Sequence, residues 1–121
     1  MICIITTYQK YIKKNNGNFW IAVDGKEIIG TIALIDYKGG RGYLKRMYVQ
    51  KNYRGLGVAN MLLDTLLNYA KKKDYSEIFL GTIESMERAN KFWKKCGFKK
   101  INSLPSDLPT YGDTIFYKYV L

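Results

Sequence analysis

The stretch Arg54-Gly55-Leu56-Gly57-Val58-Ala59 joins a strand-like run, Tyr43 to Val49, to a strongly amphipathic helix. Its two glycines let the main chain approach a ligand closely, because neither carries a Cβ atom. The first N–H groups of the following helix have no partner within that helix, and they lie at the positive end of its dipole. A run of free amides under little side-chain cover is typical of a phosphate-binding loop. The alternative interpretation is a tight strand-to-helix turn that carries a basic residue.

The common nucleotide-binding loops do not fit this stretch. A P-loop ends in Gly-Lys followed by Ser or Thr, whereas Gly57 is followed by Val58 and Ala59. A dinucleotide fingerprint has a third glycine where this chain has Asn60, and it lies in the first βαβ unit of a parallel sheet. Here two predicted hairpins come first. Both nucleotide interpretations are therefore excluded.

The residues before the glycine stretch predict an antiparallel meander of three strands. Asn18 to Val23 is the first strand, and Asp24-Gly25 supplies a two-residue hairpin turn. Ile28 to Ile35 is a nearly unbroken apolar run, which predicts a central strand covered on both faces. Lys38-Gly39-Gly40-Arg41 makes the next reversal, into the strand Gly42 to Val49. These three strands form the predicted meander.

The opening segment has two interpretations. Thr7 to Lys14 has a helical pattern, while Met1 to Thr6 is either a short strand or the front of that helix.

After the glycine stretch, apolar residues fall in pairs every four residues and form one helix face. These residues are Val58, Ala59, Leu62, Leu63, Leu66, Leu67 and Ala70. Asp74 ends the run, and Glu77 to Gly81 is a short strand. Because a helix crossover joins the two strands, we expect this strand to lie parallel to Tyr43–Val49.

The C-terminal third predicts a second helix and two strands. The helix extends from Ser85 to Cys96, and Gly97 occupies the C′ position that favours glycine. Phe98 to Ile101 starts a strand, and a loop with two prolines leads to the last strand, Thr114 to Val120.

Composition limits the class of protein. At 121 residues the chain has room for one domain with a real core, so we assign a single domain over 1–121. No apolar stretch approaches the ~20 residues of a membrane span, and Met1 to Ile5 is too short for a signal-peptide core. The chain has no histidine, and Cys3 and Cys96 have no metal-ligand spacing, which excludes zinc sites, Ser-His-Asp triads and Cys-His nucleophiles. Both thiols are most simply free and reduced, so we expect a cytoplasmic protein.

The net charge of +10 has two interpretations. One is an anionic partner, such as nucleic acid, a membrane surface or a polyphosphate cofactor. The other is a lysine-rich solvated surface. The lysines are dispersed, and most fall at the C-terminal ends of predicted helices, where cations complement the helix dipole. This favours the solvated surface, and no helix-turn-helix or aromatic RNA-binding strand pair is present in the sequence.

Taken in order, these blocks resemble the GNAT superfamily of acetyl-CoA-dependent N-acetyltransferases. The cofactor signature of that family is Arg/Gln-x-x-Gly-x-Gly/Ala, and Arg54 to Ala59 fits it. Met47-Tyr48-Val49 looks like the end of the family's fourth strand, and Ala89-x-x-Phe92-Trp93-Lys94-Lys95-Cys96-Gly97-Phe98 resembles its second cofactor helix. The resemblance extends from about Asn18 to the C-terminus.

The resemblance implies a mixed α/β (α+β) fold of the GNAT-type acyl-CoA N-acyltransferases. In that fold an antiparallel meander is followed by strand, helix, strand, helix, strand and strand. Here residues 1–17 are an atypical, shortened N-terminal part, and residues 18–121 form the cofactor-binding core. Because a short front leaves the acceptor side with less cover, we expect apolar surface to be buried in a homodimer.

The resemblance also implies roles for individual residues, with acetyl-CoA as co-substrate in a gap between two diverging parallel strands. Val49 would offer main-chain hydrogen bonds to the pantetheine arm, and the amides of Arg54 to Ala59 would hold the pyrophosphate. An amide near Met47 or Tyr48 would polarise the thioester carbonyl. Ala89 and Trp93 would contact the cofactor from the second helix.

The chain departs from the family pattern at the residues that handle protons. Many members have a tyrosine, which protonates the departing sulfur, where this chain has Trp93, and an asparagine where it has Met86. An indole N–H does not release a proton near neutral pH, so Trp93 is not that acid. Tyr117 or Tyr48 could replace it, the thiolate could leave unaided because its free pKa is near ~8.5, or transfer could be poor.

Glu84 is the candidate general base, because it follows the Glu77–Gly81 strand near the expected acceptor mouth. Alternatively, Glu84 only complements a helix N-terminus as a first-turn acid. Asp36 is a further candidate, unless it is only a turn residue before Gly39-Gly40.

The sequence thus predicts an N-acetyltransferase that moves an acetyl group from acetyl-CoA to a primary amine of unknown identity, without a metal or a membrane anchor. The second hypothesis is a catalytically weak, CoA-binding regulatory module, and the third is a basic nucleic-acid-binding protein that is supported by charge alone.

Overall fold

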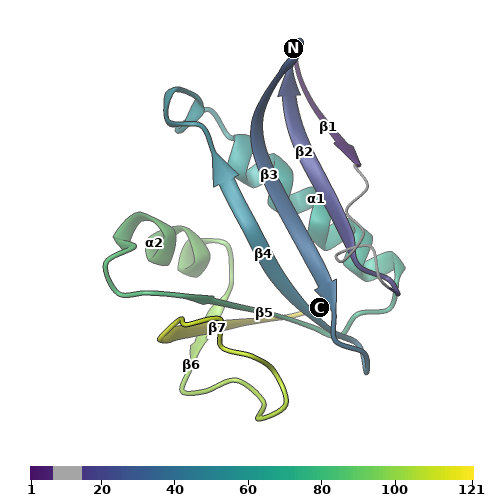
Figure 1. Ribbon diagram of the computed structural model, residues 1–121, viewed down its shortest axis with the longest axis vertical. Helices are drawn as coiled ribbons and strands as arrows, with labels where there is room; N and C mark the ends of the chain where they lie inside the picture. The colour runs from purple at the N-terminus through teal and green to yellow at the C-terminus, as the bar shows by residue number, and fades with distance from the viewer. Residues whose placement is uncertain (7–14) are drawn as a thin grey trace.

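The computed structural model describes residues 1–6 and 15–121 and places the strands of this part of the chain in one seven-stranded sheet (Figure 1). The strands are β1 (Ile2–Thr6), β2 (Asn18–Asp24), β3 (Glu27–Asp36), β4 (Arg41–Val49), β5 (Glu77–Thr82), β6 (Lys99–Ile101) and β7 (Ile115–Val120). Their order across the sheet is β1-β2-β3-β4-β5-β7-β6. The β4–β5 pair is parallel and the other pairs are antiparallel. The mixed sheet confirms the predicted fold class.

Two α-helices connect the strands on either side of β5. These are α1 (Val58–Lys72), which is the predicted crossover between the parallel strands, and α2 (Glu87–Lys95). A short 3-10 helix, η1 (Lys51–Tyr53), precedes α1. At the front of the chain Met1 to Thr6 contributes the strand β1, which extends the predicted meander by one strand. The predicted helix over Thr7 to Lys14 lies outside the described residues.

Two predicted boundaries are wrong. The hairpin turn between β2 and β3 is Gly25-Lys26 rather than Asp24-Gly25, because Asp24 still pairs with Glu27. A tight hairpin needs a positive φ in its loop, and Gly25 provides it at +61°. The helix α2 begins at Glu87 rather than Ser85, because Ser85 lies in a turn that is closed by a hydrogen bond of 3.1 Å from the Met86 amide to the Ile83 carbonyl.

The main core lies between one face of the sheet and the helices. The predicted apolar face of α1 is buried: Val58, Leu62, Leu63, Leu66, Leu67 and Ala70 all belong to it. Sheet residues such as Trp20, Ile32 and Leu44 meet this face, and Trp93 joins from α2. A second, smaller core lies apart from it and contains Tyr43.

Gly30 sets how closely α1 approaches the sheet. A Cβ atom at this position would lie 2.9 Å from the Tyr48 carbonyl oxygen and 3.1 Å from Leu62 Cδ1. Any larger residue would therefore push the beginning of α1 away from β3 and β4. The close contact fixes the first turn of α1 beside the end of β4.

The sheet opens between β4 and β5. The two strands pair only from Arg41–Tyr43 to Glu77–Phe79, and beyond these residues β5 continues beside β7 alone. Figure 1 shows the two arrows leaving a common origin and pointing apart, with α2 beside the opening. The predicted divergence of the parallel strands is therefore present.

A β-bulge in β4 accompanies this opening. Thr31 pairs with Tyr48 and Ala33 pairs with Lys45, so β4 has one residue more than β3 between these pairs. Arg46 takes up the extra length with a positive φ of 58°, and its carbonyl accepts a hydrogen bond from the Thr31 hydroxyl. Bulges bend the strand that carries them, and they are frequent beside active sites.

Candidate active site

The main cavity lies at the opening between β4 and β5 and has a volume of about 730 Å³. Its wall comes from the end of β4, the glycine stretch with the start of α1, and the beginning of α2. Ten of the predicted cofactor residues line it: Met47, Tyr48, Val49, Arg54, Gly55, Gly57, Val58, Ala59, Ala89 and Trp93. The structure thus brings together three segments that are separated in the sequence.

Three predicted site residues lie outside this wall. Leu56 is 64% exposed and stands on the outside of the glycine stretch. Tyr117 is buried on β7, and Glu84 is exposed in the turn after β5. Conversely, sequence reasoning missed a set of lining residues, namely Tyr53, Asn60, Ser85, Glu87, Arg88 and Phe92. Helical spacing from Ala89 could have indicated Ser85 and Phe92.

The glycine stretch forms a pocket of main-chain amides. Gly55 and Gly57 have φ values of 81° and 83°, in the left-handed region that favours glycine. Gly57 is the N-cap of α1, with no side-chain cap and no acidic residue in the first turn. The first helical hydrogen bond runs from the Met61 amide to the Gly57 carbonyl, at 3.0 Å, so the amides of Val58, Ala59 and Asn60, which line the cavity, have no partner within α1. This arrangement suits an anion such as a phosphate.

The end of β4 presents main-chain groups to the opening. Gly30 faces Val49, and the next amide, that of Gln50, donates to the Ile29 carbonyl at 2.8 Å. Because neighbouring residues of an antiparallel strand alternate the side to which they bond, Val49 directs its N–H and C=O towards the opening. The Arg54 side chain already donates to the Val49 carbonyl at 3.1 Å. A ligand that pairs with this carbonyl therefore either shares it with the Arg54 guanidinium or displaces that group.

The two candidate tyrosines differ in their surroundings. The Tyr117 hydroxyl donates to Asn90 Oδ1 at 2.7 Å, and burial raises the pKa of Tyr117. The Asn90 amide in turn donates to the carbonyls of Ile83 and Met86, so this network braces the turn before α2. Tyr48 lines the cavity and is 53% exposed.

The structure also shows the surroundings of the two candidate bases, Glu84 and Asp36. The acid in the first turn of α2 is Glu87, so Glu84 does not have that role. Asp36 accepts hydrogen bonds from the amides of Lys38 at 2.7 Å and Asn16 at 3.2 Å, at the end of β3. Asp36 is therefore a turn residue, as the alternative to its role as a base predicted.

A mixed sheet that opens between two parallel strands, with a helix N-terminus and a free strand edge facing one cavity, defines the class of acyl-CoA-dependent acyltransferases. The family model described as Acetyltransferase (GNAT) family matches residues 3–98. The chain belongs to this family.

Individual relatives agree with this assignment. The chain is 35% identical to N-acetylaspartate synthetase of Xenopus tropicalis over 94 residues, which are 77% of this chain and 35% of that protein. An acetyltransferase of the GNAT family from Staphylococcus aureus Mu50 has 28% identity and a TM-score of 0.89, with 99% of each chain covered. A Bacillus anthracis protein whose structure is in complex with acetyl coenzyme A has 29% identity and a TM-score of 0.77, with 95% of this chain and 68% of that chain covered.

The chain spans between about a third and a half of the length of the first curated relatives that it matches. None of the helices in the described part of the chain is both long and apolar enough to cross a lipid bilayer.

Proposed function

We propose that this protein transfers the acetyl group of acetyl-CoA to a primary amine. The observation that carries the proposal is the meeting, in one cavity, of the amide pocket at the start of α1 and the outward-facing edge of β4 at Val49. The amide pocket suits the pyrophosphate of coenzyme A, and the strand edge suits the amide groups of its pantetheine arm.

This binding mode would bring the thioester to the bulged end of β4. There the main-chain amide of Met47 would stabilise the oxyanion that forms when the uncharged amine attacks the carbonyl carbon, because the amide of Tyr48 faces β3, where Tyr48 pairs with Thr31. The new C–N bond forms, the C–S bond breaks, the nitrogen loses a proton, and the sulfur leaves as a thiolate that takes up a proton. Holding both reactants in one site supplies several kcal/mol of the barrier reduction.

We infer that Tyr48, rather than Tyr117, is the candidate proton donor. Tyr48 lines the cavity, whereas the Tyr117 hydroxyl already donates to Asn90. An unaided thiolate remains the alternative, because a thiol is a tolerable leaving group. Glu84 stays the proposed base, acting through water, since it is solvent-exposed in the turn that follows β5.

Two measurements test the function. Calorimetry with acetyl-CoA should show binding at one site per chain, and a thiol reagent should detect release of CoA when amines are added. Failure to bind acetyl-CoA would overturn the proposal. Binding without CoA release across a broad amine panel would instead favour the regulatory CoA-binding module.

We also propose that the protein works in the cytoplasm as a homodimer. Cys3 and Cys96 are both free thiols, which fits a reducing compartment. Several large apolar side chains are exposed, among them Ile5, Ile28 and Ile83. Light scattering after size exclusion at tens of micromolar protein tests the dimer, and a mass of one chain there would remove it.

A further inference from the structure

The sheet face opposite the helices carries a polar and aromatic cluster where β4 and β5 begin to separate. Tyr43 and Lys45 lie two residues apart on β4 and therefore point to the same face. Tyr43 packs with Phe79 and Leu108 in a core separate from the one beneath the helices. Leu108 belongs to the loop 102–114 between β6 and β7, so this loop covers the face.

Lys45 is held in place by an aromatic ring. Its Nζ lies 3.8 Å from the centroid of the Tyr111 ring, a cation–π contact. The Tyr111 ring packs edge-on against Tyr43 with centroids 5.2 Å apart, and its hydroxyl is hydrogen-bonded to that of Tyr37. Lys45 takes part in none of the ion pairs found among the described residues. A positioned, partly exposed cation without a counter-charge is available to an anionic ligand.

Two further polar groups meet beside Gly81, on the part of β5 that has left β4. The Tyr43 hydroxyl is fully buried and has no hydrogen-bond partner in the described part of the chain. A Cβ atom on Gly81 would lie 3.0 Å from this hydroxyl and 2.6 Å from Asp113 Oδ2. The Tyr43 hydroxyl and the Asp113 carboxylate therefore both lie against Gly81, which has no side chain to separate them.

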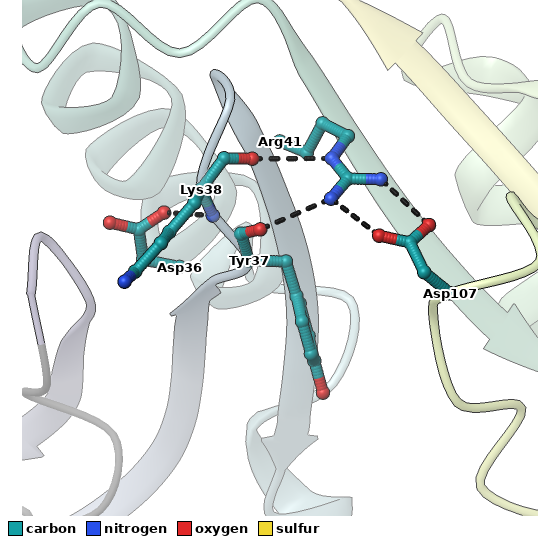
Figure 2. A network of polar contacts seen from close by, with 5 residues as sticks. All are labelled: Asp36, Tyr37, Lys38, Arg41 and Asp107. Atoms are coloured by element: carbon teal, nitrogen blue, oxygen red, sulfur yellow. Dashed lines mark hydrogen bonds and ion pairs between the residues drawn. The ribbon is translucent and has the colours of Figure 1, made fainter.

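The loop that carries Tyr111 and Asp113 is tied to the sheet. Arg41 donates to both oxygens of the Asp107 carboxylate, at 2.9 and 2.7 Å, and also to the carbonyls of Tyr37 and Lys38 (Figure 2). Because Leu108 is buried next to this ion pair in the chain, the loop is fixed against the β3–β4 turn. Tyr111 and Asp113 therefore lie on a loop whose position is fixed by these contacts.

We propose that Lys45, Tyr111 and Asp113, with the buried Tyr43 packed behind Tyr111, form an acceptor platform that selects small primary amines bearing a carboxylate, as amino acids do. This inference rests on the transferase function proposed above. Lys45 binds the carboxylate, and Asp113 attracts the ammonium group before it is deprotonated. The opposite charges of the two side chains match those of a zwitterion.

The position of the platform fits this role. Lys45 directly precedes the bulge at Arg46, and Met47 and Tyr48 after the bulge line the cavity. An amino acid whose carboxylate contacts Lys45 therefore lies beside the bulged end of β4, where the thioester carbonyl is expected. A polyamine has no carboxylate to offer, and the net charge of +10 repels it.

The test compares each amino acid with its own α-carboxamide, which differs by the loss of one negative charge. L-Alanine, L-aspartate, L-methionine and L-phenylalanine serve as probes, with CoA release measured at saturating acetyl-CoA. We expect kcat/KM to be at least about tenfold higher for the acids, as a charge-assisted hydrogen bond provides. The carboxamides have the larger fraction of uncharged amine, so intrinsic reactivity works against this result.

Variants assign the preference to Lys45. In Lys45→Met, kcat/KM for the acids should fall about tenfold or more, while that for the amides changes less than about threefold. Lys45→Arg should keep the preference. Lys72→Met, which removes an exposed cation at the end of α1, is the matched control and should behave like the wild type. Calorimetry with acetyl-CoA checks that each variant is folded and binds cofactor.

Two outcomes overturn the inference, and they differ from each other. If acids and amides are turned over equally, or if Lys45→Met keeps the preference, the platform is wrong while the transferase function stands. If acetyl-CoA binds but no amine releases CoA, the transferase function fails, and the platform fails with it.

Discussion

At the scale of single residues, Gly57 shows what a glycine does at this site. The sequence suggested that a missing Cβ lets a ligand approach, and a Cβ at Gly57 would meet no protein atom within 4 Å. The φ of 83° at the N-cap of α1 is a second reason for glycine at this position. The open space above it belongs to the cavity, so a larger side chain would fit there in place of a ligand.

We therefore predict that Gly57→Glu abolishes acetyl-CoA binding and leaves the fold intact. The new side chain occupies the phosphate position and adds a negative charge, while the left-handed backbone costs about 1–2 kcal/mol. Calorimetry measures binding, and thermal unfolding measures stability. Gly25→Glu is the control, because Gly25 also has a positive φ of 61° and open space but lies outside the cavity wall. Equal affinity in the two variants would contradict the assignment of the phosphate site.

Trp93 provides the second residue-scale prediction. It lies in the cavity wall, 5% exposed, and packs edge-on against Phe92 and Phe98. Because Tyr48 is the proposed proton donor, Trp93→Tyr should not raise the turnover number above that of Trp93→Phe, whereas a rise would show that a phenol supplies a proton that was missing, since an indole does not release one. The smaller ring should cost about 1–3 kcal/mol of stability through lost packing.

Trp93→Phe is the matched control, since it loses the same packing without gaining a hydroxyl. CoA release at saturating substrates measures turnover for both variants. If the tyrosine variant is no faster than the phenylalanine variant, then no acid is missing at this position.

Sequence reasoning at this scale could locate residues whose position follows from their neighbours in the chain. The glycine stretch, Ala89 and Trp93 belong to local patterns on predicted elements, and the structure brings them into one cavity. The hydrogen bond of Tyr117 to Asn90 joins residues 27 positions apart, so no local pattern indicates it. The contact of Lys45 with Tyr111 was invisible for the same reason.

At the scale of elements, the bulge in β4 is the feature that periodicity could not predict. Alternation along Gly42 to Val49 predicts a regular strand, whereas Arg46 interrupts it in a left-handed conformation usually taken by glycine or asparagine. The hairpin turn and the start of α2 were misplaced by one and two residues because hydrogen bonds, rather than residue type alone, decided them. The bulge shapes the opening, so it links strand geometry to the site.

The loop 102–114 leads to a pH prediction at this scale. Its tether depends on the Arg41–Asp107 pair, and the hydrogen bonds from Arg41 hold the pKa of Asp107 below its ordinary value. A carboxyl group whose pKa is lower in the folded state stabilises the fold above its unfolded pKa, and this contribution is lost as the pH falls through the folded pKa. Asp107→Asn should therefore lower the melting temperature near about pH 7, and the difference from the wild type should shrink near about pH 2.

Thermal unfolding at both pH values tests this expectation. Asp64→Asn is the control, because Asp64 is exposed on α1 and makes none of the ion pairs found among the described residues. A difference between Asp107→Asn and the wild type that persists unchanged in acid would show that the charge of Asp107 is not what ties the loop.

At the scale of the whole molecule, the single domain predicted over 1–121 remains a prediction, while the family and the sheet order around the opening agree with it. Global charge was the least informative feature of the sequence. The same excess of lysine fits a nucleic-acid binder, a solvated surface and a protein that attracts a polyanionic cofactor. Structure alone does not separate these, because charge acts at a distance and leaves no local contact.

Salt dependence separates them, and it gives the last prediction. Acetyl-CoA carries several negative charges, so a net charge of +10 should strengthen its binding at low ionic strength. Raising KCl from about 0.05 M to about 0.5 M shortens the Debye length from roughly 14 Å to roughly 4 Å. This change should weaken acetyl-CoA binding only about three- to tenfold, because the amides of the first turn of α1 would contact the pyrophosphate directly. A nucleic-acid-binding protein that contacts six or more phosphates should instead lose about a thousandfold in affinity for DNA or RNA between about 0.05 M and 0.2 M salt. Calorimetry with acetyl-CoA and fluorescence anisotropy with a labelled oligonucleotide, over one salt series, compare the two slopes. Tight oligonucleotide binding with the steep slope, together with absent acetyl-CoA binding, would reverse the order of the hypotheses.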